Sequence, residues 1–239
     1  MELRIAYLYP DHLNIYGDRG NILTLFQRCR WRGIDAVILP SGLEETIDPD
    51  IADLYFMGGG QDTQQGQVCA DLHRWKADSL RIAATNGAVF LTICGGYQLL
   101  GHYYKPHTGE ELRGLSLLDA YTIAGNTRYI GNVVIKRPDG STVVGFENHS
   151  GRTYLGDAGS ALGHVIQGHG NNGEDGQEGA MAGNLYGTYL HGSLLPKNPA
   201  LADELILKAL QRRYGTLTLD ALPDSLEQAA HERVLENAH

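Results

Sequence analysis

The sequence predicts an α/β protein with a central, mostly parallel sheet flanked by helices and with antiparallel strands added in its second half. Through the first 101 residues, short apolar runs alternate with segments of helical periodicity, which is the order of a doubly wound sheet. After Gly101 this periodicity gives way to strand-like runs and turn signals. The 239 residues are enough for a single domain, residues 1–239, with a substantial core.

Strands and helices alternate in the first half. Apolar runs rich in β-branched or aromatic residues predict strands, and apolar residues three or four positions apart predict amphipathic helices. The expected strands are residues 3–9, 36–39, 53–57 and 88–93, and the expected helices are residues 22–31, 68–84 and a short helix from residue 97. Gly33 is placed to end the first of these helices.

The second half is richer in strands. The expected elements are strands at residues 115–123, 132–136, 142–146, 164–167 and 185–190, a helix at residues 201–214 and a tail, residues 216–239. The sequence Pro138-Asp139-Gly140 predicts a hairpin turn. Residues 168–176 are polar and glycine-rich, which indicates a loop. Leucines in the tail predict that it docks on the surface of the domain.

Composition and charge exclude several classes of protein. A net charge of −9 without a basic cluster argues against a nucleic-acid-binding surface. The three cysteines, Cys29, Cys69 and Cys94, are far apart and odd in number, which favours neither a disulfide framework nor a zinc site. We expect a cytoplasmic protein that is not inserted in a membrane, because no apolar run has the length of a membrane span and none resembles a signal peptide.

Residues 88–101 hold the most informative motif. Cys94 follows a buried strand at once, and Gly95 and Gly96 lead into a helix. A nucleophile on a sharp turn between strand and helix, with small neighbours, is typical of a nucleophile elbow. The helix N-terminus would favour a thiolate at Cys94, and the Gly95 N–H would point toward a developing oxyanion. The alternative is a buried structural cysteine.

Two further stretches bear on the same chemistry. A thiolate nucleophile needs a base, and His191 is the histidine on which a predicted strand ends. Residues 58–62 form a glycine-rich loop after another strand, but no lysine follows in the pattern of a phosphate-binding loop. The alternatives are an ordinary core or surface histidine and a simple turn.

These motifs resemble those of a known family. Cys94-Gly95-Gly96-Tyr97-Gln98 is similar to the signature of class I (triad) glutamine amidotransferases, which have a flavodoxin-like fold. Gln98-Leu99-Leu100-Gly101 and Tyr189-Leu190-His191-Gly192 resemble the cobyric acid synthase-like (CobB/CobQ) branch. The resemblance covers the chain to about residue 214. Thr92 departs from it, because the family usually has glycine at that position.

The resemblance implies roles for particular residues. Cys94 would be the nucleophile and His191 its base, and backbone N–H groups of Gly95 and of Gly59 or Gly60 would form the oxyanion hole. Arg128 would bind the substrate, with Gln98 as a further pocket residue, because an arginine fork suits a carboxylate.

The third catalytic residue is left open by the sequence. Many members of the family have glutamate where this chain has Ser193. Either a distant carboxylate or a partner subunit would then orient His191.

Three less specific stretches of sequence indicate one branch of the family. Residues 16–21, 146–153 and 171–176 resemble the glutaminase subunits of lipid II isoglutaminyl synthases. That resemblance implies L-glutamine as substrate and a heterodimer with a Mur ligase-like, ATP-dependent subunit of the MurT type. No metal or cofactor is expected in this chain, and ATP and Mg²⁺ are expected on the partner. The alternatives are the glutaminase half of another synthetase, such as a cobyrinate-type enzyme, a non-catalytic scaffold, or a cysteine hydrolase of γ-glutamyl substrates.

Overall fold

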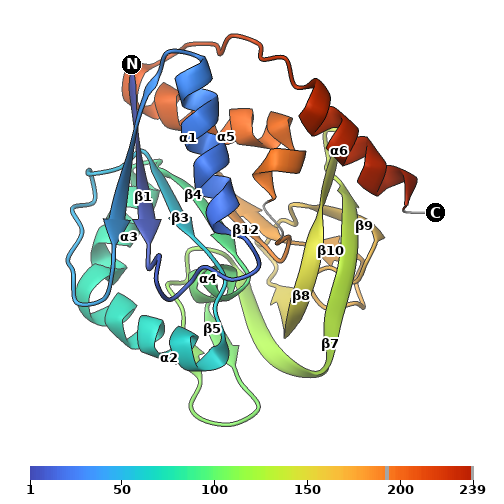
Figure 1. Cartoon of the computed structure of the whole chain (residues 1–239). Coiled ribbons are helices and arrows are strands. Elements are labelled where there is room, and N and C mark those ends of the chain that lie inside the picture. Colours follow the sequence, from blue (N-terminus) through green and yellow to red (C-terminus); the bar gives the residue numbers. More distant parts are fainter. Residues whose placement is uncertain (192–193, 238–239) are drawn as a thin grey trace.

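The computed structural model describes residues 1–191 and 194–237 and contains two sheets that lie side by side (Figure 1). The first sheet has the strand order β11-β12-β4-β3-β1-β2. Its strands are β1 (Glu2–Leu8), β2 (Asp35–Ser41), β3 (Leu54–Met57), β4 (Val89–Ile93), β11 (Ala180–Ala182) and β12 (Leu185–Thr188). All neighbours pair in parallel except the edge strand β11. The predicted α/β class, with a mostly parallel sheet, is confirmed.

Helices cover both faces of this sheet. Helices α1 (Arg19–Trp31) and α5 (Pro199–Tyr214) lie on one face, above the sheet in Figure 1, and the helical segments from residue 62 to residue 100 lie on the other. These segments are α2 (Asp62–Asp71), the π-helical turn η1 (Leu72–Lys76), α3 (Ala77–Thr85) and α4 (Gly95–Leu100). Strands β3 and β4 are buried along their whole length, because helices pack on both sides.

The single helix predicted for residues 68–84 is wrong in detail. The helical segment begins earlier, and a π-helical turn separates α2 from α3. Lys76, at the end of that turn, is buried, and its ammonium donates to the Asp71 carboxylate at 2.9 Å and to the Gly42 carbonyl at 2.8 Å. A buried ion pair of this kind depends on tertiary contacts, so the spacing of apolar residues could not indicate it.

The second sheet is built on a long two-stranded ribbon. Strands β7 (Ala120–Lys136) and β8 (Thr142–Leu155) pair antiparallel, and the turn predicted at residues 138–140 joins them. The smaller strands are β5 (Tyr103–Lys105), β6 (Leu112–Arg113), β9 (Gly163–Gln167) and β10 (Gln177–Glu178). The separate strands predicted at residues 115–123 and 132–136 are wrong, because one strand, β7, begins at Ala120 and continues to Lys136, with a register irregularity between Ala124 and Tyr129. In the sequence, the polar and glycine residues at this bulge resemble a loop between two strands.

The tail contacts the body of the protein through polar anchors. The Arg28 guanidinium, on α1 and only 1% exposed, donates to the carboxylates of Asp203 and Asp224 at 2.7 Å each. Helix α6 (Ser225–Glu236) buries none of its residues fully, but His231 contacts the Thr142 hydroxyl at 2.8 Å. Among the described residues, no helix is long and apolar enough to cross a lipid bilayer.

A close contact beneath the elbow fixes the position of α4. Gly187, in β12, faces the ring of Tyr97, which is fully buried in α4. A methyl group at Gly187 would overlap that ring and would lie 2.9 Å from a methyl carbon of Leu118. Strand β12 and helix α4 can therefore approach this closely only because residue 187 is glycine.

We predict that Gly187→Ala lowers the free energy of unfolding by about 1–3 kcal/mol, because Tyr97 has no room to retreat. Gly66→Ala is the matched control: position 66 lies within α2 with open space around it, and alanine should be neutral or stabilising there by up to about 1 kcal/mol. Urea denaturation of the two variants measures both changes. If the two variants were equally stable, the close packing of Gly187 against Tyr97 would be contradicted.

Candidate active site

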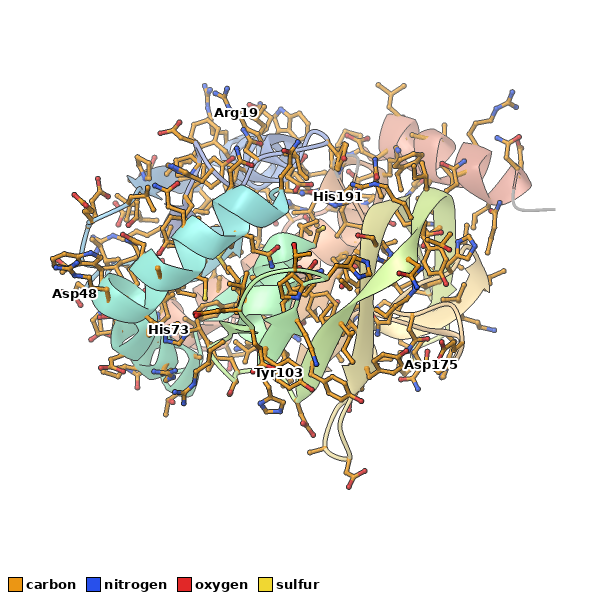
Figure 2. The ribbon with its side chains drawn as sticks, turned by 90° about the horizontal axis from the view of Figure 1, so that it is seen from below. Arg19, Asp48, His73, Tyr103, Asp175 and His191 are labelled. Carbon is orange, nitrogen blue, oxygen red and sulfur yellow. The ribbon has the colours of Figure 1, made fainter. Side chains whose placement is uncertain are left out.

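The candidate site lies where four neighbouring parallel strands end. Strands β12, β4, β3 and β1 lie next to one another in the sheet, in that order, and their carboxyl ends meet at one edge. The segment after β1 carries Asp18, the one after β3 carries residues 58–60, Cys94 follows β4, and His191 comes after β12. Ligands of open α/β sheets bind at this edge. His191 is fully buried, and in Figure 2 it lies apart from the labelled Tyr103 and Asp175.

Cys94 occupies a strained turn between β4 and α4, as the elbow motif predicts. Its φ of 50° and ψ of −106° lie outside the regions that side chains other than glycine usually adopt, at a cost of about 1–3 kcal/mol. The Cys94 N–H donates to the Thr188 carbonyl at 2.8 Å, and the Gly96 N–H donates to the Gly58 carbonyl at 3.1 Å. The turn is thus held from both neighbouring strands, β12 and β3.

His191 is fixed at its backbone and at its ring. Its backbone N–H and carbonyl pair with Phe146 of β8, and its Nδ1 lies 3.0 Å from Oδ1 of Asp18. Both side chains are fully buried. Because a carboxylate only accepts hydrogen bonds, Nδ1 carries a proton. Nε2 has no hydrogen-bond partner among the described residues, and it is the nitrogen left for proton transfer.

Cys94 and His191 flank the same glycine. A methyl group added at Gly59 would lie 2.7 Å from Cε1 of His191 and 3.2 Å from Cβ of Cys94. Burial disfavours the charged imidazole, but negative charge on the Cys94 sulfur and the hydrogen bond that Nδ1 donates to Asp18 outweigh this effect and raise the pKa of His191. The arrangement therefore favours the protonated form of the His191 imidazole beside a negatively charged sulfur.

Asp18 is the functional residue that sequence reasoning missed. Its Oδ1 faces His191, and its Oδ2 accepts the Gly59 N–H at 2.7 Å. It lies 173 positions from His191 in the sequence, in the string at residues 16–21, to which the sequence analysis assigned no catalytic residue. A distant carboxylate of the same chain thus occupies the place beside the histidine. Ser193, where many relatives have glutamate, lies outside the described residues.

The glycine loop offers Gly60 rather than Gly59 as an oxyanion donor. The Gly59 N–H is already donated to Asp18. The Gly60 nitrogen would lie 3.2 Å from a methyl group added at Gly95, so these two backbone segments adjoin. No acceptor for the N–H of Gly60 or of Gly95 is found in the described part of the chain. Two free donors beside Cys94 suit a developing oxyanion.

Cys94 opens onto a cavity of about 480 Å³. Its lining includes both predicted pocket residues, Arg128 and Gln98, although they lie far apart in the sequence. Arg128 projects from the bulge of β7, where its Nε donates to Oδ1 of Asn148 at 2.6 Å and its Nη2 donates to the Tyr16 hydroxyl at 3.1 Å. A guanidinium placed a short way from the nucleophile can bind the carboxylate of an amino acid.

Gln98 is held by the protein itself. Its Nε2 donates to the Tyr189 hydroxyl at 3.0 Å, and its Oε1 accepts from Nε2 of Gln65 at 2.7 Å. The side chain is 6% exposed. Gln98 therefore shapes the wall behind Cys94, and the oxygen and the nitrogen of its side-chain amide are each already engaged with a neighbour.

Residues 146–153 form another wall of the cavity. His149 stacks on Tyr189 with ring centroids 3.7 Å apart, and burial lowers the pKa of His149. The buried Glu147 carboxylate accepts the backbone N–H groups of His169 and Gly170 at 3.0 and 3.1 Å. These bonds tie the loop at residues 168–176 to β8. Residues 146–153 and 168–176, to which the sequence analysis gave no chemical role, therefore surround the site.

No group of three or more His, Cys, Asp or Glu side chains in the described ranges could hold a metal ion.

Comparison with known proteins agrees with this geometry. A family model described as a CobB/CobQ-like glutamine amidotransferase domain matches residues 4–199. The chain therefore belongs to the CobB/CobQ-like glutamine amidotransferases. It is 46% identical to "Lipid II isoglutaminyl synthase (glutamine-hydrolyzing) subunit GatD" of Staphylococcus aureus strain N315, covering 100% of this chain and 97% of that protein.

Further relatives and one solved structure are also similar to this chain. The GatD subunit of Streptococcus pneumoniae is 40% identical over 97% of this chain and 90% of its own length. A cobyric acid synthase of Pelotomaculum thermopropionicum is 32% identical over 90% of this chain but only 41% of its own length. The fold is shared with a structure titled "Crystal structure of glutamine amidotransferase", at a TM-score of 0.58 and 14% identity over 86% of this chain and 98% of the other.

We predict that Asp18→Asn lowers the pKa of His191, because the amide removes the negative charge that stabilises the imidazolium. An opposite charge at this distance typically shifts a pKa by about 1–3 units. A larger share of His191 is then neutral at pH 7, and an NMR titration of its Cε1–H signal measures the change. An unchanged titration would show that Asp18 does not interact with the imidazole.

Proposed function

We propose that this chain is the glutaminase subunit of a glutamine-dependent amidotransferase in peptidoglycan synthesis. The observation that carries the proposal is the Cys94–His191–Asp18 arrangement, of which Cys94 lines the same cavity as Arg128. Support comes from the names of the two GatD relatives, whose similarity extends over almost the whole of each chain.

The proposed reaction begins with the Cys94 thiolate. Its sulfur attacks the side-chain amide carbon of L-glutamine, and the resulting oxyanion accepts hydrogen bonds from the N–H groups of Gly60 and Gly95. The His191 imidazolium gives its Nε2 proton to the leaving nitrogen as the carbon–nitrogen bond breaks. Ammonia departs, and a γ-glutamyl thioester remains on Cys94.

Water completes the cycle. Neutral His191 accepts a proton from a water molecule, whose oxygen attacks the thioester carbon. The carbon–sulfur bond then breaks, and glutamate leaves while the Cys94 thiolate and the His191 imidazolium are restored. Throughout, Asp18 holds the protonated Nδ1 of His191, so that Nε2 remains the nitrogen that exchanges protons. Neither step requires a metal ion or a cofactor in this chain.

Arg128 would select glutamine over a bare amide. Its guanidinium lies in the same cavity as Cys94 and would bind the substrate's α-carboxylate. The separation between the α-carboxylate and the side-chain amide of the substrate then determines which carbonyl carbon reaches the sulfur of Cys94. Glutamine carries its amide and its α-carboxylate at opposite ends, so Arg128 can bind one end while Cys94 attacks the other.

The ammonia would be used on another polypeptide. The sequence has no phosphate-binding loop of the kind that activates carboxylates with ATP. We therefore propose a heterodimer with a Mur ligase-like, ATP-dependent subunit of the MurT type, which would bind ATP and Mg²⁺ and amidate D-glutamate in lipid II. A cytoplasmic location suits this chemistry.

A cobyrinate-type synthetase is the second candidate, favoured by the similarity to cobyric acid synthases. This chain, however, corresponds to only 41% of the Pelotomaculum thermopropionicum protein. Which synthetase subunit binds the purified chain distinguishes the two functions.

We predict that the purified chain releases ammonia from L-glutamine, and that release rises when the Mur ligase-like subunit is added. Cys94→Ser should lower the rate at least about a thousandfold, with or without the partner, because it removes the nucleophile. Cys69→Ser is the control, since Cys69 is buried outside the cavity, and it should keep the rate within about twofold. Coupled detection of glutamate and ammonia measures both.

If neither preparation releases ammonia although the fold is intact, the amidotransferase function fails. A non-catalytic role of the same fold would then replace it. If ammonia release is unaffected by Cys94→Ser, the nucleophile has been wrongly assigned.

A further inference from the structure

Tyr16 stands out as an exposed aromatic residue in a strained turn beside the catalytic candidates. Its φ is 52° and that of Gly17 is 83°, and the Asp18 N–H donates to the Ile15 carbonyl at 3.2 Å. Two central residues with positive φ are the combination of a type I′ turn, which glycine, asparagine and aspartate usually occupy. A bulky aromatic residue at the first of these positions is an outlier.

The strain has a geometric consequence for the site. The turn from Ile15 to Asp18 is anchored by the Ile15 N–H, which donates to the Gly59 carbonyl at 3.3 Å. From this turn the Asp18 carboxylate reaches Nδ1 of His191, while the Tyr16 ring packs edge-on against the same imidazole with centroids 5.1 Å apart. One short turn therefore places two different side chains on His191.

Tyr16 also reaches across the cavity. Its hydroxyl oxygen accepts a hydrogen bond from Nη2 of Arg128 at 3.1 Å, which joins the loop after β1 to the bulge of β7. The side chain is 43% exposed and lines the cavity that contains Cys94. Because the oxygen accepts from Arg128, the hydroxyl hydrogen stays available, and within residues 1–191 and 194–237 no acceptor is found for it.

The donors that remain free lie next to each other. Nε of Arg128 is engaged with Oδ1 of Asn148, and Nη2 is engaged with Tyr16 and, at 3.4 Å, with the Asn148 carbonyl. Nη1 has no partner in the described part of the chain. Nη1 and the Tyr16 O–H are thus two adjacent donors that one carboxylate could bridge with its two oxygens.

We propose that Tyr16 is a substrate-positioning residue whose hydroxyl, oriented by Arg128, donates the second hydrogen bond to the α-carboxylate of glutamine. This proposal rests on the proposed glutaminase function and adds a specificity-determining residue to it. The turn that holds Asp18 against His191 then also sets where the far end of the substrate binds. The strain at Tyr16 is explained, because a relaxed turn would carry the ring away from the cavity.

The test removes only the hydroxyl group. Tyr16→Phe keeps the ring against His191, and Tyr121→Phe removes a matched hydroxyl from a tyrosine that does not line the cavity. The probe is 6-diazo-5-oxo-L-norleucine, a glutamine analogue with an α-carboxylate that alkylates a reactive cysteine. Intact-mass spectrometry of the full chain gives its half-saturating concentration and its maximal rate of alkylation separately. Iodoacetamide, which lacks the carboxylate, is the second probe.

We expect Tyr16→Phe to raise the half-saturating concentration of the analogue about tenfold, which is the loss of one hydrogen bond to a charged group. The maximal alkylation rate and the rate with iodoacetamide should stay within about twofold, and Tyr121→Phe should match the wild type throughout. With glutamine and the partner subunit, the same variant should raise KM about tenfold and leave kcat unchanged.

The outcomes separate the two proposals. If the wild-type chain is not alkylated by the analogue at Cys94, the glutaminase function itself fails. If the wild type is alkylated with saturation but Tyr16→Phe binds the analogue equally well, the role of Tyr16 is wrong while the glutaminase function stands. Equal losses with the analogue and with iodoacetamide would show a disturbed Cys94 or His191 instead, and would also overturn the proposal.

Discussion

The carboxylate of Asp18 holds the candidate site together. It is fully buried, and burying a carboxylate is costly unless hydrogen bonds compensate for the lost water. One oxygen faces Nδ1 of His191, and the other accepts the Gly59 N–H. These two contacts join the segments that follow β1, β3 and β12. Because β4 lies between β3 and β12, Cys94 is enclosed by the same three segments.

That constraint explains why strain collects at this edge of the sheet. Cys94 and Tyr16 both have positive φ values, and neither is glycine. Each is held by backbone hydrogen bonds from a neighbouring segment, Cys94 to Thr188 and the turn of Tyr16 to Gly59. Strained residues persist where the surrounding structure over-determines them, and such residues gather at functional sites. The compact glycine packing at Gly59 and Gly187 lets these segments approach one another.

The β7–β8 ribbon supplies the part of the site that the parallel sheet lacks. The sheet edge brings the reactive groups together, but among the described residues that line the cavity the lone arginine or lysine, Arg128, comes from the other sheet. The bulge in β7 carries Arg128 into the cavity, and Asn148, on the paired strand, fixes the guanidinium. Residues 168–176 support this wall through Glu147. The reactive groups and the guanidinium of the cavity therefore come from two different sheets.

Sequence patterns alone determined the fold class, the elbow at Cys94 and the strand leading toward His191, because each depends on residues that are close together in the chain. A buried strand is visible as an apolar run, and an elbow as a cysteine followed by two glycines. The full length of β7 was missed, because its bulge depends on pairing with another strand. The break between α2 and α3 was missed, because the buried Lys76–Asp71 pair depends on tertiary contacts.

Only the tertiary structure decided which carboxylate faces His191 and which glycine N–H remains free. Asp18 lies in a polar loop that local patterns cannot distinguish from an ordinary turn, and it meets His191 only because β1 and β12 belong to the same parallel sheet. The choice of Gly60 over Gly59 depends in turn on Asp18. The sequence determines which chemical groups are available, whereas the order of the strands determines which of them meet.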